Sequence, residues 1–288
     1  MNPVAPAAAD IAAAMRGTRQ EPTGPLGMAP ESPAASGAVL FARFAYPPNE
    51  LGYCGPNDSA ALLQYGASGE VDRGLAQLAR GFGGAWPYLE FIAGRNGIAD
   101  PLDRRVVEAY WLGNELLDSD PTAPEAFGAH VLERFRRRAG QGWSLIAQAV
   151  PVGAVPNHAF HVFSVYPWVG LLGSGGEHPL HVLDRCRIRW GKVAAVEGDS
   201  VVVLSRPLTW DGRRLALGPY RAETVTRGMG GTALAGDLEA GNAVALHWGW
   251  ICSRLSRRQL ANLRRNVEAQ IAIANRRLTA RSLERVLE

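Results

Sequence analysis

The segment from Asp184 to Leu204 constrains the fold of this chain more than any other stretch. It contains the apolar residues Ile188, Trp190, Val193 and Val196, then the motif Glu197-Gly-Asp-Ser200, then the apolar run Val201–Leu204. The glycine of the middle motif supplies the backbone freedom that a tight hairpin turn requires. We therefore expect two antiparallel strands joined by this turn, and we assign them to a small β-barrel.

A single cysteine lies at the start of the first expected strand. Because the side chains of a strand alternate, one face would carry Asp184, Cys186, Ile188 and Trp190, and the other Arg185, Arg187 and Arg189. On composition alone, a cysteine in this position packs as a small apolar side chain. A thiolate in the same position would be a soft metal ligand, which makes Cys186 the sharpest candidate site of the sequence.

Two motifs in the last third of the chain carry a family resemblance. The first is Cys186-Arg-Ile-Arg-Trp-Gly-Lys-Val193 followed by Val196-Glu-Gly-Asp199, and the second is Gly236-Asp-Leu-Glu-Ala-Gly-Asn-Ala-Val-Ala-Leu-His247-Trp-Gly-Trp-Ile251. In order and in most spacings they resemble the HypC/HupF family of nickel-iron hydrogenase assembly chaperones. The resemblance extends roughly from Leu183 to the C-terminus.

This resemblance implies a HypC-like (OB-like) β-barrel and a non-enzymatic accessory role in hydrogenase maturation. It places the iron-handling pair of the family on Cys186 and His247, with iron held transiently as a cyanide- and carbonyl-ligated fragment. The implied partners are the hydrogenase large-subunit precursor and other maturation proteins. For His247 the alternative is a core histidine with satisfied hydrogen bonds.

The whole chain is predicted to be an α+β protein of 288 residues with two folded units. We expect a disordered Ala/Pro-rich tail at 1–38 and a mainly helical domain at 39–176. The barrel would occupy 177–255 and a long C-terminal helix 256–288, which starts at a Ser256 to Gln259 capping box.

Helical patterns in the N-terminal half are separated by Gly, Pro and Asp-Pro signals. They lie at 60–65, 71–80, 86–93, 104–117 and 124–138. An ordered stretch from Ala38 is expected to break at Tyr46-Pro-Pro, and the β-prone run Val155–Leu172 to be extended.

Cys54 provides an alternative function. It precedes a predicted helix, where the positive end of the helix dipole would lower the pKa of a thiol. Together with His158 or His161 it would form a cysteine-dependent hydrolase or acyltransferase site. The same histidines could join Cys54 around a metal, whereas Cys252 is interpreted as structural.

An RNA-binding barrel is the third interpretation, and it rests on five arginines in and near the hairpin: Arg185, Arg187, Arg189, Arg213 and Arg214. The net charge of +3 is small for this length, so nothing in the overall charge favours nucleic acid or an anionic membrane. Three widely spaced cysteines indicate free thiols. No signal peptide or membrane span is recognisable, and we expect a cytoplasmic protein.

Overall fold

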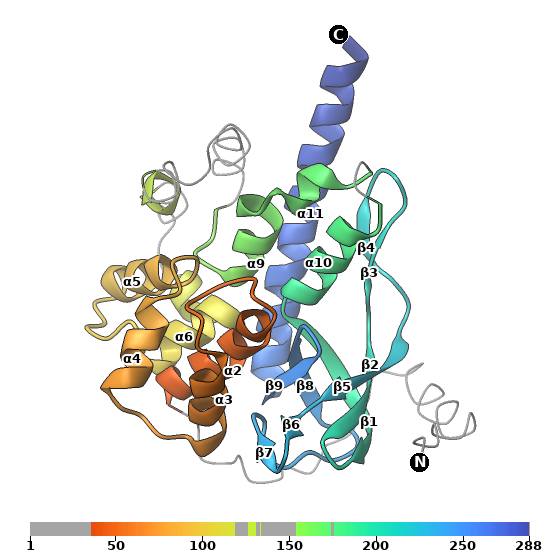
Figure 1. The fold of residues 1–288 in the computed structure, drawn as a ribbon. Coiled ribbons are helices and arrows are strands. Elements are labelled where there is room, and N and C mark those ends of the chain that lie inside the picture. The colour runs from red at the N-terminus through yellow and green to blue at the C-terminus, as the bar shows by residue number, and fades with distance from the viewer. Residues whose placement is uncertain (1–35, 119–125, 131–132, 134–153, 174–175, 288) are drawn as a thin grey trace.

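The computed structural model describes residues 36–118, 126–130, 133, 154–173 and 176–287 (Figure 1). Helices form the N-terminal part, mixed β-sheets follow, and a long helix completes the described chain, in agreement with the predicted α+β class. The predicted tail at 1–38 lies outside the described residues except for Ser36, which caps the first helix, and Gly37 and Ala38, which begin it.

The N-terminal helices begin where short polar side chains can cap them. Ser36, Asp58, Asp72 and Asp103 each accept a hydrogen bond from a backbone N–H of the first turn. The elements are α2 (Gly37–Glu50), α3 (Ser59–Ser68), α4 (Arg73–Arg80), α5 (Trp86–Arg95), α6 (Arg104–Trp111) and the 3-10 helix η1 (Glu115–Leu117). These helices confirm the helical predictions at 60–65, 71–80 and 86–93, whereas the one predicted at 104–117 ends at Trp111 and is followed by the separate η1. Most of the helix predicted at 124–138 lies outside the described residues.

The expected break at Tyr46 is wrong, because α2 continues through Pro47 and Pro48 to Glu50. The two prolines occupy the last turn of the helix. Neither can donate a backbone hydrogen bond, so the carbonyl groups one turn earlier are left without their usual helical donors. For Pro48 that carbonyl belongs to Phe44, and it acquires another partner in the site described below.

The stretch Val155–Leu172, expected to be extended, is helical. It contains α9 (His158–Phe160), the π-helix η4 (His161–Val165) and the 3-10 helix η5 (Pro167–Leu171). Asn157 caps the start, because its side chain accepts a 2.7 Å bond from the N–H of Ala159. Val162, Phe163 and Val169 of this stretch are buried in the core, and packing overrides its strand propensity.

Cys186 does not begin a strand. It is the last residue of α10 (His178–Cys186), a helix with a proline in its first turn. The alternation expected for residues 184–188 is therefore wrong, and the predicted barrel region 177–255 starts with a helix. The first strand, β1, begins at Arg189.

Five strands pair in the order β1-β2-β5-β9-β8, and pairing of β8 with β1 closes them into a barrel. They are β1 (Arg189–Glu197), β2 (Ser200–Ser205), β5 (Arg221–Thr226), β8 (Ala243–His247) and β9 (Trp250–Arg254). All neighbours are antiparallel except β5 and β9. The predicted hairpin is confirmed, and Gly198 adopts the positive φ of 60° that its turn needs.

Two short ribbons and one long helix complete the described fold. The ribbons pair β3 (Leu208–Trp210) with β4 (Leu215–Leu217), and β6 (Gly228–Met229) with β7 (Thr232–Ala233). The helix α11 (Arg257–Leu287) starts at the predicted capping box, where Ser256 and Gln259 exchange bonds of 3.0 and 3.2 Å. Gln259 also donates a 2.7 Å bond to Glu108, so α11 docks on the N-terminal helices.

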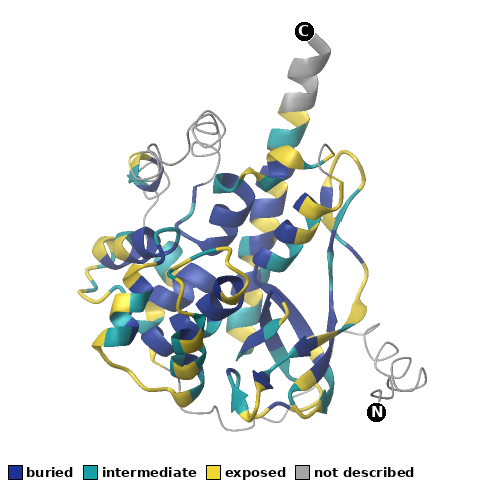
Figure 2. Cartoon of the chain, in the orientation of Figure 1, coloured by how far each residue is buried: buried dark blue, intermediate teal, exposed yellow. Residues whose placement is uncertain are grey.

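One buried cluster crosses the predicted boundary at residue 176. It extends from Ala38 in α2 to Ala274 in α11 and includes Cys186 and Trp248 (Figure 2). A second, smaller cluster fills the barrel and includes Val203 and Val244. The helical part and the barrel therefore share a core, and the domain boundary stays a prediction. Among the described residues, no helix combines the length and apolarity needed to cross a bilayer.

Buried charges hold the junction between α10 and β1 beside Cys186. Glu223 accepts hydrogen bonds from Arg189 and Ser205, and its second oxygen accepts a 2.7 Å bond from Arg185. Arg187, whose side chain is almost completely buried, pairs with Asp184 at 2.8 Å. The junction is consequently held by ion pairs, and those of Arg187 and Arg189 involve almost completely buried guanidinium groups, where water weakens them little.

Replacing Glu223 with glutamine should destabilise the protein, because Arg189 would remain charged and buried without its carboxylate. Removing one partner of a buried ion pair costs about 3–5 kcal/mol in the free energy of unfolding. Urea denaturation followed by circular dichroism measures the loss. The control is Glu197→Gln at the exposed end of β1, expected to change stability by less than about 0.5 kcal/mol. Equal stability of the two variants would contradict a structural role for Glu223.

Candidate metal centre

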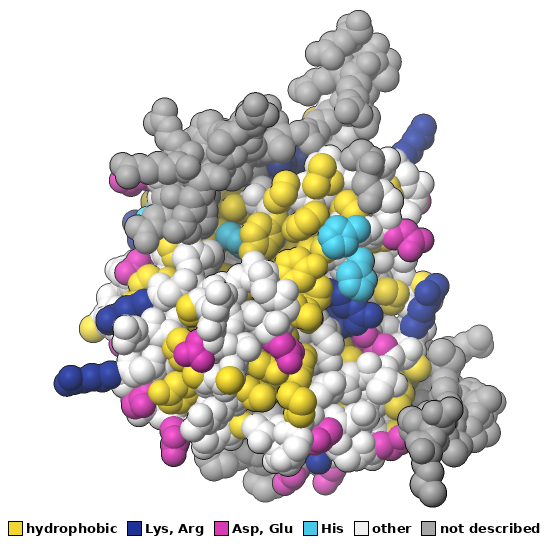
Figure 3. Space-filling view, viewed as in Figure 1, with side chains coloured by type: hydrophobic (Ala, Val, Ile, Leu, Met, Phe, Trp, Pro, Cys, Tyr) yellow, Lys and Arg dark blue, Asp and Glu magenta, His cyan; other side chains and the backbone are white. Residues whose placement is uncertain are grey.

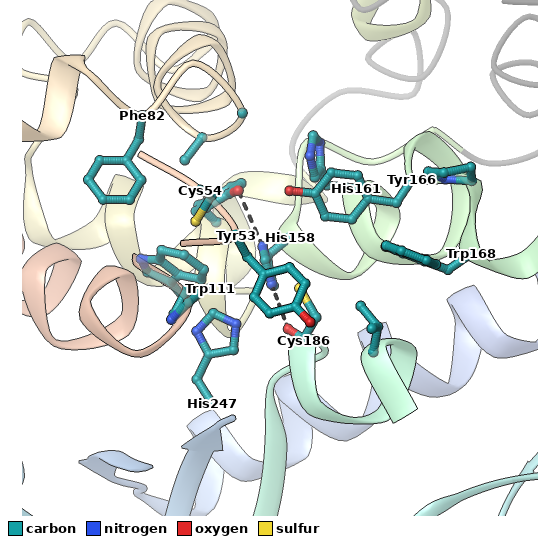
Figure 4. A pocket seen from close by; sticks show the side chains of 16 residues that line it. Tyr53, Cys54, Phe82, Trp111, His158, His161, Tyr166, Trp168, Cys186 and His247 are labelled. Atoms are coloured by element: carbon teal, nitrogen blue, oxygen red, sulfur yellow. Dashed lines mark hydrogen bonds between the residues drawn. The ribbon is translucent and has the colours of Figure 1, made fainter. Parts of the chain in front are cut away.

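Three residues that are distant in the sequence meet in the interior. His158 of α9, Cys186 at the end of α10 and His247 at the end of β8 each place one ligand atom within 4.8 Å of the other two. All three side chains are buried. Figure 4 shows the two imidazole rings and the thiol turned toward one another.

The cluster opens on a cavity of about 160 Å³. Its walls are mostly aromatic and apolar, with Phe82, Trp111, Trp168 and Val182 among the lining residues. Tyr53 lies at the outer side, 43% exposed, and stacks on Trp248 with ring centroids 4.4 Å apart. Figure 3 shows hydrophobic side chains and histidines gathered on this face of the molecule. A group bound in the cavity would thus be screened from bulk water by aromatic rings.

The tautomer of His247 is set by the proline-rich end of α2. Pro48 has no N–H for the Phe44 carbonyl, and the Nδ1 of His247 lies 2.7 Å from that oxygen. Because a carbonyl can only accept, Nδ1 carries the proton and Nε2 keeps its lone pair. Nε2 is buried without a hydrogen-bond partner among the described residues. Burial and the neighbouring His158 lower the pKa of His247 well below its ordinary value, so the ring is neutral.

His158 is held at both nitrogens. Its Nε2 donates to the Cys186 carbonyl at 2.9 Å, and its Nδ1 lies 3.3 Å from the hydroxyl of Tyr110, which donates to it. Burial lowers the pKa of His158 to about 4, so this ring is also neutral at physiological pH. The ring packs against Trp111, with centroids 4.7 Å apart.

The Cys186 thiol is the third member. Burial raises its pKa, and the proximity of Cys54 acts in the same direction, so the sulfur is protonated near neutral pH. A metal ion would replace this proton, because the thiolate is the form that binds metals. One thiolate and neutral imidazoles are donors that suit first-row transition metals and do not suit Mg²⁺ or Ca²⁺. The unpartnered Nε2 of His247 is an observation that a metal would explain.

His161 lines the same cavity but belongs to a different contact. Its Nδ1 is 2.8 Å from the hydroxyl of buried Tyr88, and burial lowers its pKa to about 3. His158 and His161 lie three residues apart in continuous helical backbone, which puts both rings on one side. The extended conformation expected for Val155–Leu172 would have put these two rings on opposite faces, so this arrangement follows from the helix.

Cys54 also reaches the cavity, from the loop between α2 and α3. Asn49 holds this loop by donating to the carbonyls of Cys54 and Pro56, at 2.7 and 2.6 Å. The N-cap of α3 is Asp58, four residues later, and burial raises the pKa of Cys54 to about 12. The expected lowering of its pKa by a helix N-terminus is therefore wrong. Both nitrogens of His158 already form hydrogen bonds, so His158 could act as a base for Cys54 only by giving up one of them.

The arginines behind the RNA-binding interpretation are placed differently from the expectation. Arg187 and Arg189 are each 1% exposed and lie in ion pairs, and Arg185 pairs with Glu223 from α10. They do not form one exposed face of a strand. Only Arg213 and Arg214, in the loop between β3 and β4, are exposed among the five arginines considered.

Sequence reasoning did not place His158 next to Cys186. The run around it was interpreted as extended, and no spacing in the sequence links it to residue 186. Asn157 was the available signal, because an asparagine before an apolar run can cap a helix. Trp111 contacts both cluster histidines, and no sequence motif marks it as a site residue.

A family model described as a family of unknown function (DUF6390) matches residues 33–281. The chain belongs to this family. The matched region includes His158, Cys186 and His247, together with the helical part and the barrel. No match was found among curated proteins or among solved structures. The resemblance to hydrogenase chaperones stays a prediction.

Cys54 should react slowly with iodoacetamide near neutral pH. With a pKa of about 12, in place of the ordinary 9.0, its thiolate fraction is about a thousandfold below that of an unperturbed thiol. Its rate should rise about tenfold for each unit of pH until the pH approaches this pKa. Mass spectrometry of labelled peptides measures the rate, with the denatured protein as the control in which all three cysteines react alike. Rapid labelling of native Cys54 would instead favour the thiol-enzyme alternative.

Proposed function

We propose that this protein is an accessory factor in the maturation of a nickel-iron hydrogenase. In this proposal it handles the iron fragment that carries cyanide and carbonyl ligands, with Cys186 and His247 as its binding residues. The observation that carries the proposal is the convergence of these two side chains, 61 positions apart (247 minus 186), at a buried cavity. They are the two residues on which the family resemblance places the iron-handling pair.

The chemistry of the pair supports handling of such a cargo. Cys186 supplies a sulfur that becomes a soft thiolate ligand when its proton is lost, and His247 presents a lone pair that is already oriented. Aromatic walls would exclude water from bound carbonyl and cyanide groups. The closed five-stranded barrel and the hairpin at Gly198 agree with a HypC-like, OB-like barrel.

The position of Cys186 gives this proposal a distinctive feature. Cys186 is internal, so its backbone nitrogen belongs to a peptide bond. A peptide nitrogen is a poorer metal ligand than the free amine of an N-terminal cysteine. Donors other than sulfur must therefore come from side chains. His247 is the first of these, and its ring is fixed by a contact to α2 rather than by its own barrel.

Infrared spectroscopy tests the cargo directly. Protein purified anaerobically from a host that makes a nickel-iron hydrogenase should show cyanide and carbonyl stretching bands. Cys186→Ala and His247→Ala should abolish or strongly reduce these bands. Cys252→Ala is the matched control, because this buried thiol lies in β9 and does not line the cavity. Absence of the bands from the unaltered protein, under conditions where the hydrogenase matures, would refute iron-fragment handling.

Binding of the hydrogenase large-subunit precursor tests the assembly role. The unaltered protein should capture the purified precursor, and Cys186→Ala or His247→Ala should weaken capture and lower hydrogenase activity in cells. Cys252→Ala should behave as the parent. Full capture and full activity in both site variants would show that this cavity is not the working surface.

Metal binding should release about one proton per ion near neutral pH. Burial and the nearby Cys54 raise the pKa of Cys186, so its thiol must lose a proton to bind. The pKa values of His158 and His247 are lowered, so the imidazoles are neutral above a pH of about 6 and release none. The affinity for Co²⁺ should therefore fall about tenfold for each unit that the pH drops from 8 to 6. Titration calorimetry in buffers of different ionisation enthalpy counts the protons, and Cys186→Ser should reduce the count to near zero.

A further inference from the structure

His158 has a position that the proposed pair of ligands does not explain. Its ring is buried beside the Cys186 thiol and His247, with a nitrogen within 4.8 Å of both ligand atoms. It comes from α9 in the helical part of the chain, outside the region that resembles the hydrogenase chaperones. The hydrogen bond to Tyr110 does not by itself account for the position of His158 so close to Cys186 and His247.

We propose that His158 is the third protein ligand of a first-row transition metal ion bound by Cys186 and His247. This inference rests on the proposed metal-handling role and assigns a residue to the same site. One sulfur and two nitrogens from three side chains leave at least one coordination position free. All three residues line the cavity, so the free position faces it. The ion therefore keeps a site for a small exogenous ligand.

Ligation by His158 has a defined local cost. The ring must give up one of its two present bonds, either that from the Tyr110 hydroxyl or that to the Cys186 carbonyl. Both are bonds between neutral groups, and the Tyr110 bond is long at 3.3 Å. The remaining bond then fixes the orientation of the ring, as hydrogen bonds commonly do for metal-binding histidines. Burial keeps the ring neutral, which is the form that binds a metal.

The geometry also explains why the ligands are held by both parts of the chain. His247 is oriented by Phe44 of α2, and His158 bonds the carbonyl of Cys186. Trp111 of α6 packs against both rings, with centroids 4.7 and 5.7 Å away. The helical part thus supplies one ligand and the support of another, and the bound ion would join α9 to the barrel.

Cobalt(II) added to the metal-free, full-length protein is the probe. The unaltered protein should show a thiolate-to-cobalt charge-transfer band and the intense d–d bands of a four-coordinate ion. Added azide should shift the d–d bands, because the free position is accessible from the cavity. His158→Ala should lower the affinity by at least roughly 10- to 100-fold, the loss known for changes outside the ligand shell. Its d–d bands should weaken while the charge-transfer band from Cys186 remains.

His161→Ala is the matched control, since His161 lines the same cavity three residues later and bonds Tyr88. It should bind cobalt within about twofold of the parent. Affinity and d–d intensity equal to the parent in His158→Ala would overturn the inference and leave the proposed function standing. Normal binding by both Cys186→Ser and His247→Ala would refute the proposed site itself.

X-ray absorption of the zinc-loaded unaltered protein gives a second measurement that needs no variant. The number of imidazole ligands should be two with one sulfur, and a single imidazole would overturn the inference. Near-ultraviolet circular dichroism of each metal-free variant establishes that its packing is intact. A His158→Gln variant, which retains a polar side chain of similar length, replaces the alanine variant if that one does not fold.

Discussion

The hydrogen bond between His247 and the Phe44 carbonyl is the contact on which the geometry of the site depends. It joins residues 203 positions apart, and it exists because Pro48 leaves that carbonyl without a helical donor. An ordinary residue at position 48 would supply an N–H that competes with the imidazole for the same oxygen. A local irregularity at the end of α2 therefore decides which nitrogen of a distant histidine carries the proton.

Ion pairs position Cys186, as the hydrogen bond to Phe44 positions His247. The cysteine closes α10, and the next residues turn into β1 under the control of Arg187 and Arg189, both fully buried. Glu223 and Asp184 compensate these charges from two directions. Because an uncompensated buried guanidinium is costly, the chain has few alternatives at this junction. The ion pairs of Arg187 and Arg189 and the packing of Cys186 in the shared core together fix the position of the thiol.

Sequence patterns predicted the elements whose signals are local. The Gly198 turn, the capping box at Ser256 and the N-terminal helices all depend on a few adjacent residues, and the structure contains them. The motifs around Cys186 and His247 mark both residues, and the two side chains do lie together. The secondary structure around Cys186 was less predictable, because the alternation of residues 184–190 is typical of a strand, whereas Cys186 ends the helix α10.

The parts that the sequence could not predict depend on long-range packing. His158 occupies a run rich in β-branched and aromatic residues, whose local preference for strands is overridden by burial against the core. Likewise, the raised pKa of Cys54 follows from the walls of the cavity and not from its distance to a helix start. No single window of sequence contains the groups that enclose either residue.

The wide separation of the three cluster residues along the chain links ligand binding to folding. Twenty-eight positions separate His158 from Cys186, and the unfolded chain offers no geometry that brings all three donors together. An ion that binds all three therefore binds the native state in preference to the unfolded ensemble, and mass action makes the melting temperature rise with the concentration of free ion. Loading would then act as a stability signal, because filled and empty molecules would differ in their resistance to unfolding and to proteolysis.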